Sequence, residues 1–196
     1  PSKIRSTFTR RDNNFADDNV LIALDTFGDA TRAYEIGCNP YGIQCDFLYS
    51  PTGGEDSRYD LIFDTAARIT EDGWEAEFAI PFSSLRFPDT PEQTWRVDFW
   101  RNQPREARYQ ASWAAYDRDE QCWPCQWGTI TGIEDVDPAG GLELIPAFTA
   151  NQEGERQEDG DFENGDVTGE VSLTAKYNIT SDLSAEATLN PDFSQV

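Results

Sequence analysis

A strict alternation of apolar and polar residues over Trp74–Ile80 constrains the fold of this chain more than any other feature. Apolar side chains stand at every second position, at Trp74, Ala76, Phe78 and Ile80. Successive side chains of a strand point to opposite faces, so this period of two predicts a strand with one buried face. Asp72-Gly73 before it is a turn signal, and Pro81 ends the strand because it lacks a backbone donor. We interpret the whole stretch, Asp72–Phe87, as a core strand whose end is plugged by Phe82, Leu85 and Phe87, and it indicates a kind of domain but no function.

Similar short runs recur along the chain, with Gly, Pro, Asn and Asp between them, and aromatic residues are plentiful. This pattern is typical of an all-β protein. The segment Asn39–Gly42 is a strong hairpin connection between two of the runs. We therefore expect an antiparallel β-sandwich over residues 1–137, with further strands at Val20–Asp25, Arg32–Cys38, Ile43–Tyr49, Leu61–Ile69, Trp95–Arg101, Tyr109–Tyr116 and Gly128–Ile133.

The character of the sequence changes at Asp135–Gly141, which we interpret as a linker. Beyond it, Leu142–Asn151 resembles a strand and Gln152–Asp166 an acidic loop, and Val167–Asn178 and Leu183–Leu189 alternate around a short turn. Long alternating strands with tight turns on one side and long polar loops on the other are typical of a membrane β-barrel. The alternative is an ordinary antiparallel sheet with one solvent-exposed face. Three strands cannot close a barrel, which needs about eight.

Charge and residue usage exclude several classes of function. The formal net charge is −22, which repels phosphate backbones and disfavours nucleic-acid binding. The chain contains no His, so Ser-His and Cys-His catalysis and His-ligated metals are excluded together. It has no apolar run long enough for a transmembrane helix. It starts at Pro1 without Met, which we interpret as a chain already cut.

The order of several motifs carries a resemblance to a known family. PSKIRSTFTRRD, the run from LIALDTFGDAT to GIQCD, ARITEDGWEAEFAIPFSSLRF, WGTITGI, LELIPAF and NPDFSQV follow one another along nearly the whole chain. In this order they resemble a family of bacterial outer-membrane proteins, in which a domain similar to family 9 carbohydrate-binding modules precedes a large β-barrel. The resemblance implies a sandwich over 1–137 that lacks its first strands, and a linker with the first barrel strands over 138–196. It thus implies a fragment cut at both ends, from the outer membrane or periplasm of a Gram-negative-type bacterium.

The four cysteines predict disulfides. Cys38 and Cys45 flank the hairpin turn, and Cys122 and Cys125 form a CxxC motif. Three connectivities are open. If Asn39–Gly42 is a four-residue loop, Cys38 and Cys45 are diagonal neighbours near the upper limit for a disulfide, so pairing between the hairpin and the CxxC loop is credible. A zinc site from all four cysteines and a redox CxxC are the alternatives.

Aromatic residues suggest a ligand. Sugar rings stack on exposed aromatic faces, and Trp100, Trp113, Tyr116, Trp123 and Trp127 gather late in the predicted sandwich. Most of these rings are expected in the core. The loop residues Tyr116 and Trp123 are least easily explained as core, and Asp117 and Asp119 stand beside them. These four residues are our candidate glycan contacts.

Carboxylates could supply oxygen ligands to Ca²⁺. Asp25 and Asp29 are the chosen candidates among several acidic groups, although solvated loops are the usual explanation, and no cofactor is required. The other groups are Asp12, Asp17 and Asp18, and Asp159, Asp161 and Asp166. No pair of carboxylates stands apart as a glycosidase would need.

The sequence therefore predicts a non-enzymatic protein of the cell envelope. Its sandwich would bind glycan or a glycan-bearing partner. The alternative is a structural or assembly subunit held by other envelope proteins in a larger complex, because an incomplete sandwich has open edges that invite strand addition.

Overall fold

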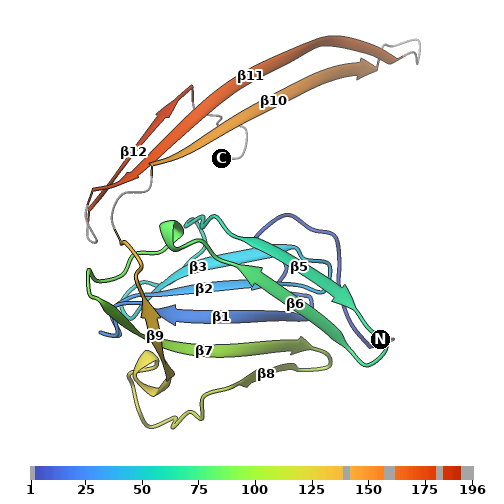
Figure 1. Cartoon of the computed structure of the whole chain (residues 1–196). Coiled ribbons are helices and arrows are strands. Elements are labelled where there is room, and N and C mark those ends of the chain that lie inside the picture. Colours follow the sequence, from blue (N-terminus) through green and yellow to red (C-terminus); the bar gives the residue numbers. More distant parts are fainter. Residues whose placement is uncertain (1–2, 139–141, 157–161, 180–182, 191–196) are drawn as a thin grey trace. The chain divides into compact units, whose positions relative to one another are not determined.

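The computed structural model describes residues 3–138, 142–156, 162–179 and 183–190 of the chain. They form an all-β protein with antiparallel sheets and two short 3-10 helices, η1 (Phe82–Ser84) and η2 (Pro124–Gln126) (Figure 1). Within these residues no helix is long and apolar enough to cross a membrane. The chain divides into two compact units, Pro1–Pro138 and Ala139–Val196.

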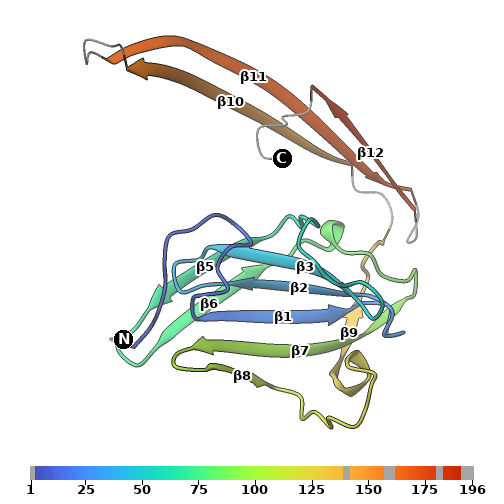
Figure 2. The ribbon, with the colours of Figure 1, turned by 180° about the vertical axis from the view of Figure 1, so that it is seen from behind.

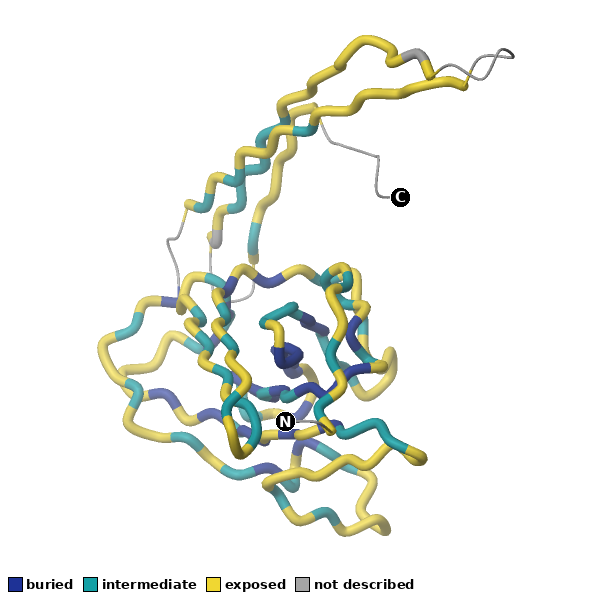
Figure 3. Tube along the Cα trace, turned by 90° about the vertical axis from the view of Figure 1, so that its right-hand side faces the viewer, coloured by how far each residue is buried: buried dark blue, intermediate teal, exposed yellow. Residues whose placement is uncertain are grey.

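A seven-stranded antiparallel sheet is the frame of the N-terminal unit. Six strands follow one another in the order β4-β3-β2-β1-β7-β8, and β9 pairs with β7 on the edge opposite to β1, which is also the edge that β8 uses (Figures 1 and 2). The sheet is strongly curled and forms half of a barrel (Figure 3). Its strands are β1 (Asn19–Asp25), β2 (Ala33–Cys38), β3 (Gln44–Ser50), β4 (Gly54–Asp56), β7 (Glu92–Pro104), β8 (Arg108–Ser112) and β9 (Gly128–Glu134).

The inner face of this sheet carries the main hydrophobic core. Ile22 of β1 is opposite both Ile36 of β2 and Phe99 of β7, so alternate residues of neighbouring strands share this face. A two-stranded sheet of β5 (Asp64–Ile69) and β6 (Trp74–Ala79) packs on it. The buried core residues are Leu24, Tyr34, Ile36, Leu61, Phe63, Leu85, Phe87, Trp95 and Val97.

The alternation that opened the sequence analysis forms strand β6 as expected. Trp74, Ala76 and Phe78 are half-buried, and Glu75 and Glu77 are exposed. The strand ends at Ala79, before Pro81. Leu85 and Phe87 then reach the core with 3% and 0% of their surfaces exposed, so the predicted apolar plug is confirmed for these two, whereas Phe82 keeps 42% exposed.

The outer face of the seven-stranded sheet is also covered. Leu21, Phe47 and Trp100 are buried there, with Phe15 from the N-terminal segment and Tyr116 and Trp123 from the loop after β8 packed on them. Trp127 continues this cover over Ala23 and Ala33. Since β1 and β2 are covered on both faces, all six residues of β2 are buried, including Glu35.

The C-terminal unit is a three-stranded antiparallel sheet in the order β10-β11-β12. Its strands are β10 (Leu142–Arg156), β11 (Phe162–Asn178) and β12 (Ser184–Leu189). Phe148 is opposite Val171, and Leu173 is opposite both Pro146 and Leu189, so one face of the sheet is apolar. Thr149, Glu170 and Lys176 lie on the other face with Thr174 and Thr188.

Several expected boundaries were wrong, and three of the differences matter for the fold. The acidic loop expected at Gln152–Asp166 is shorter, because β10 and β11 continue to pair as far as Arg156 and Phe162 around a register shift between Gln152 and Gly154. The strand expected at Tyr109–Tyr116 ends at Ser112. We expected the Gly-rich segment Ser50–Arg58 to be a loop, but it contains the short strand β4, in which Gly54 pairs with Ser50 of β3.

Candidate functional site

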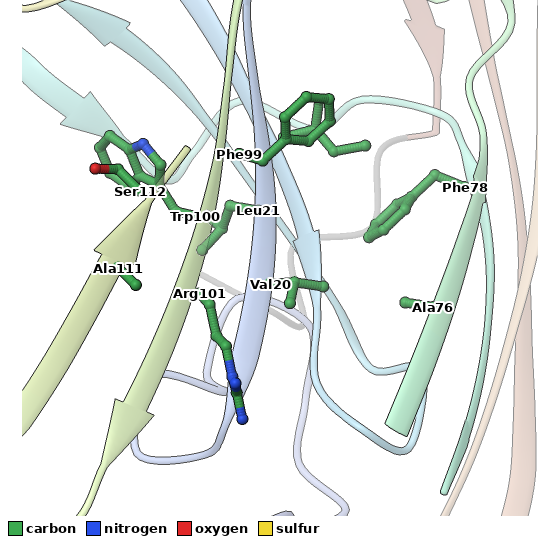
Figure 4. Close-up of a pocket in the computed structure, with 10 residues that line it drawn as sticks. Val20, Leu21, Ala76, Phe78, Phe99, Trp100, Arg101, Ala111 and Ser112 are labelled. Carbon is green, nitrogen blue, oxygen red and sulfur yellow. The ribbon is translucent and has the colours of Figure 1, made fainter. Parts of the chain in front are cut away.

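An open apolar groove lies between β6 and the inner face of the seven-stranded sheet (Figure 4). Its floor crosses three strands, because Ile22 is opposite Phe99, Val20 is opposite Arg101, and Arg101 is opposite Ala111. Ala76 and Phe78 of β6 form its wall, and its volume is about 460 Å³. The groove exists because β5 and β6 are too few to cover a sheet of seven strands.

Exposed aromatic rings extend the floor of the groove along β8. Phe99 has 46% of its surface exposed, Trp113 has 63% and Tyr109 has 58%. The ring of Trp113 meets that of Phe99 edge-on, with centroids 6.0 Å apart, and it covers the backbone of Gly128, where a Cβ would lie 2.1 Å from the ring. Three large rings therefore stay accessible on the inner face that β6 leaves uncovered.

The wall of the groove has an open strand edge. β6 pairs with β5 on one side, from Ile69–Trp74 to Asp64–Ala79. In the part of the chain that the structure describes, no strand pairs with its other side. Alternate N–H and C=O groups of an edge strand point away from its partner and are free to bind another strand.

One end of the groove is basic. A second hollow of about 460 Å³ continues it past Val20 and Arg101 to Trp74, Lys3 and Arg105, and Asp72 is the one carboxylate on its lining. Arg105 is already paired with the buried carboxylate of Asp18, at 2.8 Å. Lys3 and Arg101 have no ion-pair partner among the described residues. In a chain of net charge −22, this end can attract an anionic group.

The candidate glycan contacts Tyr116 and Trp123 are packed against other rings. The Trp123 ring contacts Trp100 at 4.4 Å, Tyr49 at 4.9 Å and Trp127 at 5.4 Å between centroids. Tyr116 lies 6.3 Å from Trp123 and donates its hydroxyl hydrogen to Asp98. Both residues are half-buried, and their ring faces help to cover the outer face of the sheet.

The two acidic candidates beside them belong to an exposed turn. The Asp117 carboxylate accepts a hydrogen bond from the backbone N–H of Asp119 at 2.9 Å, and the Asp117 N–H donates to Gln126 at 2.7 Å. Both aspartates are exposed. Tyr116 and Trp123 therefore contact each other and further rings, and Asp117 and Asp119 bond within their own turn.

Asp98 organises this side of the molecule, and sequence reasoning missed it. It is completely buried, and its carboxylate accepts hydrogen bonds from the backbone N–H groups of Phe99 and Ala114, both at 2.8 Å. The indole N–H of Trp100 and the hydroxyl of Tyr116 also donate to it. Burial first, and then the bond to Asp98, raises the pKa of Tyr116. The only signal in the sequence is a charged residue at an alternating position of a strand, which does not identify its partners.

Glu35 is a second buried carboxyl group on the same outer face. It is opposite Ala23 and Phe47, only 2% of its surface is exposed, and its Oε1 has no hydrogen-bond partner. Burial is the main cause that raises its pKa to about 8, and the charge of Glu55 adds to it. Glu35 is therefore mostly protonated at neutral pH.

The calcium candidates Asp25 and Asp29 stabilise turns. The Asp25 carboxylate accepts hydrogen bonds from the backbone N–H groups of Gly28 and Ala30 at 2.8 and 2.9 Å. Asp29 accepts bonds from the N–H and the hydroxyl of Thr31. The TFGDAT segment folds as a tight loop in which Gly28 and Ala30 both have positive φ, and these bonds close it.

Another group of carboxylates comes closer together. Oxygens of Asp12, Asp46 and Asp60 lie within 4.8 Å of one another. Arg11 occupies this place, since its guanidinium donates to Asp46 and to the carbonyl of Leu61 and lies 3.7 Å from Asp60. Burial is the main cause that raises the pKa values of Asp12 and Asp46. The arrangement is an ion-pair cluster, and Asp17 and Asp18 likewise have protein partners, whereas Asp159 and Asp161 lie outside the described residues.

The cysteines divide into two kinds. Cys122 and Cys125 form a disulfide across the CxxC, so disulfide bonding of these two residues is confirmed, whereas the pairing between the hairpin and the CxxC loop that we found credible was wrong. Cys38 and Cys45 are buried thiols, so the expectation that they also form disulfides was wrong. The reason is register: Cys38 is opposite Gln44 and Cys45 is opposite Gly37, one residue away from the pairing we assumed. A shift of one residue turns side chains to opposite faces of the sheet. The four sulfurs therefore do not form a zinc site.

Comparison with protein-family models, with curated proteins and with solved structures finds no match to this chain. The resemblance given by the motif order stays a prediction.

Proposed function

We propose that this chain is a non-catalytic protein of a bacterial cell envelope, in which the C-terminal unit faces lipid and the N-terminal unit is an assembly module bound by other envelope proteins. The observation that carries the proposal is an inverted pattern of exposure in the C-terminal sheet. Phe148, Val171 and Leu189 have 71%, 64% and 69% of their surfaces exposed, and Glu143 and Lys176 on the polar face are half-buried.

An apolar face of this size is unusual on a sheet surrounded by water. It spans all three strands, and its exposed members are Leu142, Leu144, Phe148, Val167, Val171, Tyr177 and Leu189. Exposed patches of this extent are typical of contacts with protein or lipid. Strands with apolar side chains on one face and polar ones on the other are typical of outer-membrane barrels. Because three strands cannot close a barrel, the proposal requires further strands beside them.

Flotation of the full chain with phosphatidylcholine vesicles tests the lipid contact. The chain is diluted from urea into vesicles and centrifuged through a density gradient. Phe148→Arg should abolish flotation, because a cation on the lipid face costs about 2–4 kcal/mol near the bilayer centre. Ala147→Arg is the matched control, because Ala147 is opposite Ser172 on the polar face. This variant should float like the parent chain.

Equal flotation of the two arginine variants, with the parent chain in the vesicle layer, would contradict the lipid-facing role.

The packing of Tyr116 and Trp123 supports the assembly role over the glycan role. Stacking with a sugar needs an accessible ring face, and these rings contact Trp100, Tyr49 and Trp127 instead. The apolar groove beside β6 and its open strand edge are features that bind protein.

Glycan binding is the second candidate, and one observation favours it. Tyr109 of β8 and Trp113, directly after β8, present exposed rings, and Arg101 lies on the same face. A glycan array and calorimetry on the full chain, with and without Ca²⁺, test this candidate. Binding that Trp113→Ala removes would support it, and an array without any binding would reject it.

A further inference from the structure

We propose that the groove beside β6 binds one extended segment of a partner protein, which adds to β6 as an antiparallel strand, with alternate apolar side chains in the groove and an acidic C-terminal end at Lys3 and Arg101. This inference rests on the proposed assembly role of the N-terminal unit and gives that role a site and a class of ligand.

The open edge of β6 determines that the ligand is a strand. β6 offers six residues, Trp74–Ala79, whose outward backbone groups have no strand partner in the described part of the chain. A strand of this length extends about 20 Å. β5 covers the opposite side of β6, so the free edge is the one that borders the groove. A lipid chain would leave these backbone groups unpaired, whereas a peptide backbone has donors and acceptors at the spacing of the β6 edge.

The groove determines the side chains of the ligand. Side chains of an added strand alternate between the two faces of its sheet. Those on the inward face would meet Val20 and Ile22 of β1 and Phe99 of β7, beside Phe78 of β6 (Figure 4). All four are apolar, so alternate positions of the ligand should be apolar. The intervening positions face away from the core, as Glu75 and Glu77 do on β6, and can be polar.

The basic end determines the direction and the charge of the ligand. Trp74, at the start of β6, lies at the end of the groove with Lys3, Arg101 and Arg105. A strand antiparallel to β6 therefore reaches this end with its C-terminal residues. Lys3 and Arg101 have no ion-pair partner among the described residues, so they are available to an acidic side chain or a terminal carboxylate.

A synthetic peptide probe tests the inference on the full chain. The probe has six residues, valine alternating with threonine, a fluorescent N-terminus and a free C-terminal glutamate. Fluorescence anisotropy measures its binding. We expect Ala76→Arg to weaken binding at least about tenfold, because its long side chain fills the groove. A tenfold change in affinity corresponds to about 1.4 kcal/mol of binding free energy. The matched control is Ala79→Arg, which places the same side chain on the exposed face of the same strand and should bind normally.

Two further arms test the backbone pairing and the charge. A probe with proline at its central positions cannot donate to the β6 edge and should not bind. Arg101→Gln should weaken binding of the acidic probe several-fold and leave binding of a probe with a neutral C-terminal amide unchanged. Near-ultraviolet circular dichroism of each variant checks that the N-terminal unit is folded.

Each of the following outcomes would overturn the inference: no binding of the acidic probe to the folded parent chain at millimolar concentration, equal binding of the proline probe, or equal loss of binding in Ala76→Arg and Ala79→Arg. The first of these, with vesicle flotation intact, would overturn the strand site and leave the lipid-facing role standing. A glycan that competes with the acidic probe, and whose binding is the same in the parent chain and in Ala76→Arg, would also overturn the inference in favour of a sugar site.

Discussion

The hydroxyl of Tyr116 donates a hydrogen bond to the buried carboxylate of Asp98, and this contact joins the loop after β8 to the central strand β7. The same carboxylate binds the N–H of Ala114 and the indole of Trp100. Through it, the loop that carries Trp123 is held as a cover on the outer face of the seven-stranded sheet.

Removal of the Tyr116 hydroxyl should destabilise the N-terminal unit. Tyr116→Phe keeps the ring and deletes one donor to a buried charged group, so we expect a loss of about 1.5–3 kcal/mol. Urea unfolding followed by Trp fluorescence measures it. Tyr109→Phe is the control. Because Tyr109 is 58% exposed, this variant should change the free energy of unfolding little. A Tyr116→Phe chain as stable as its parent would show that the bond contributes nothing.

Glu35 should make the N-terminal unit less stable as pH rises. Its pKa is about 8 in the folded chain against an ordinary value of 4.5, so between these pH values the folded state holds a proton that the unfolded state has lost. Stability then falls by about 1.4 kcal/mol per pH unit across that window.

Glu35→Gln should remove this slope. When the pH rises from 5.5 to 8, the free energy of unfolding should fall by about 3 kcal/mol less in the variant than in its parent. Urea titrations at both pH values measure it. Glu77→Gln, at an exposed position of β6, should keep the slope of the parent. Parallel curves for parent and Glu35→Gln would exclude a protonated Glu35.

The two kinds of cysteine should be separable by alkylation and mass spectrometry. Burial raises the pKa values of both Cys38 and Cys45 to about 12, so few thiolates exist at pH 8 and iodoacetamide should not label them in the folded chain. In urea, Cys38 and Cys45 should be labelled without reductant, whereas Cys122 and Cys125 should be labelled only after reduction. A peptide that links Cys38 or Cys45 to another cysteine would contradict this assignment.

Loss of the Arg11 side chain should destabilise the chain strongly. Arg11→Leu leaves the Asp46 carboxylate, 1% exposed, without its cation, and we expect a cost of about 3 kcal/mol. Arg58→Leu is the comparison, because the pair of Arg58 and Asp56 is exposed and water replaces the lost contact. Thermal unfolding of both variants measures the contrast, and similar melting temperatures would refute it.

The sequence predicted the elements of the fold well because most of them follow from local alternation. β6 ends where Pro81 requires it, and the alternation of Val167–Asn178 forms β11 with one apolar face. The hairpin was predicted, but its register was not, because the five residues Asn39–Ile43 form the turn and the Asn39 N–H bonds to the Ile43 carbonyl. That single residue decides on which face Cys45 lies.

The candidate site was harder to predict because it depends on pairing between distant segments. The residues around Tyr116 and Trp123 do not show that these two rings pack on Leu21 and Phe47. Leu21 lies nearly a hundred residues earlier in the chain. The groove is likewise a property of sheet order, since Val20, Ala76 and Arg101 meet only when β6 lies over β1 and β7. The basic end of the groove could not be predicted from a sequence whose net charge is strongly negative.

The double cover of the seven-stranded sheet has a consequence for how such a sequence can diverge. Every residue of β2 is buried, and Gly37 has no room for a Cβ, which would lie 2.5 Å from the carbonyl oxygen of Val20. Substitutions in β2 therefore disturb packing whichever face they meet. The exposed residues of β6 and β8 carry no such constraint, so among relatives the middle of the sheet should vary more slowly than the exposed positions of β6 and β8.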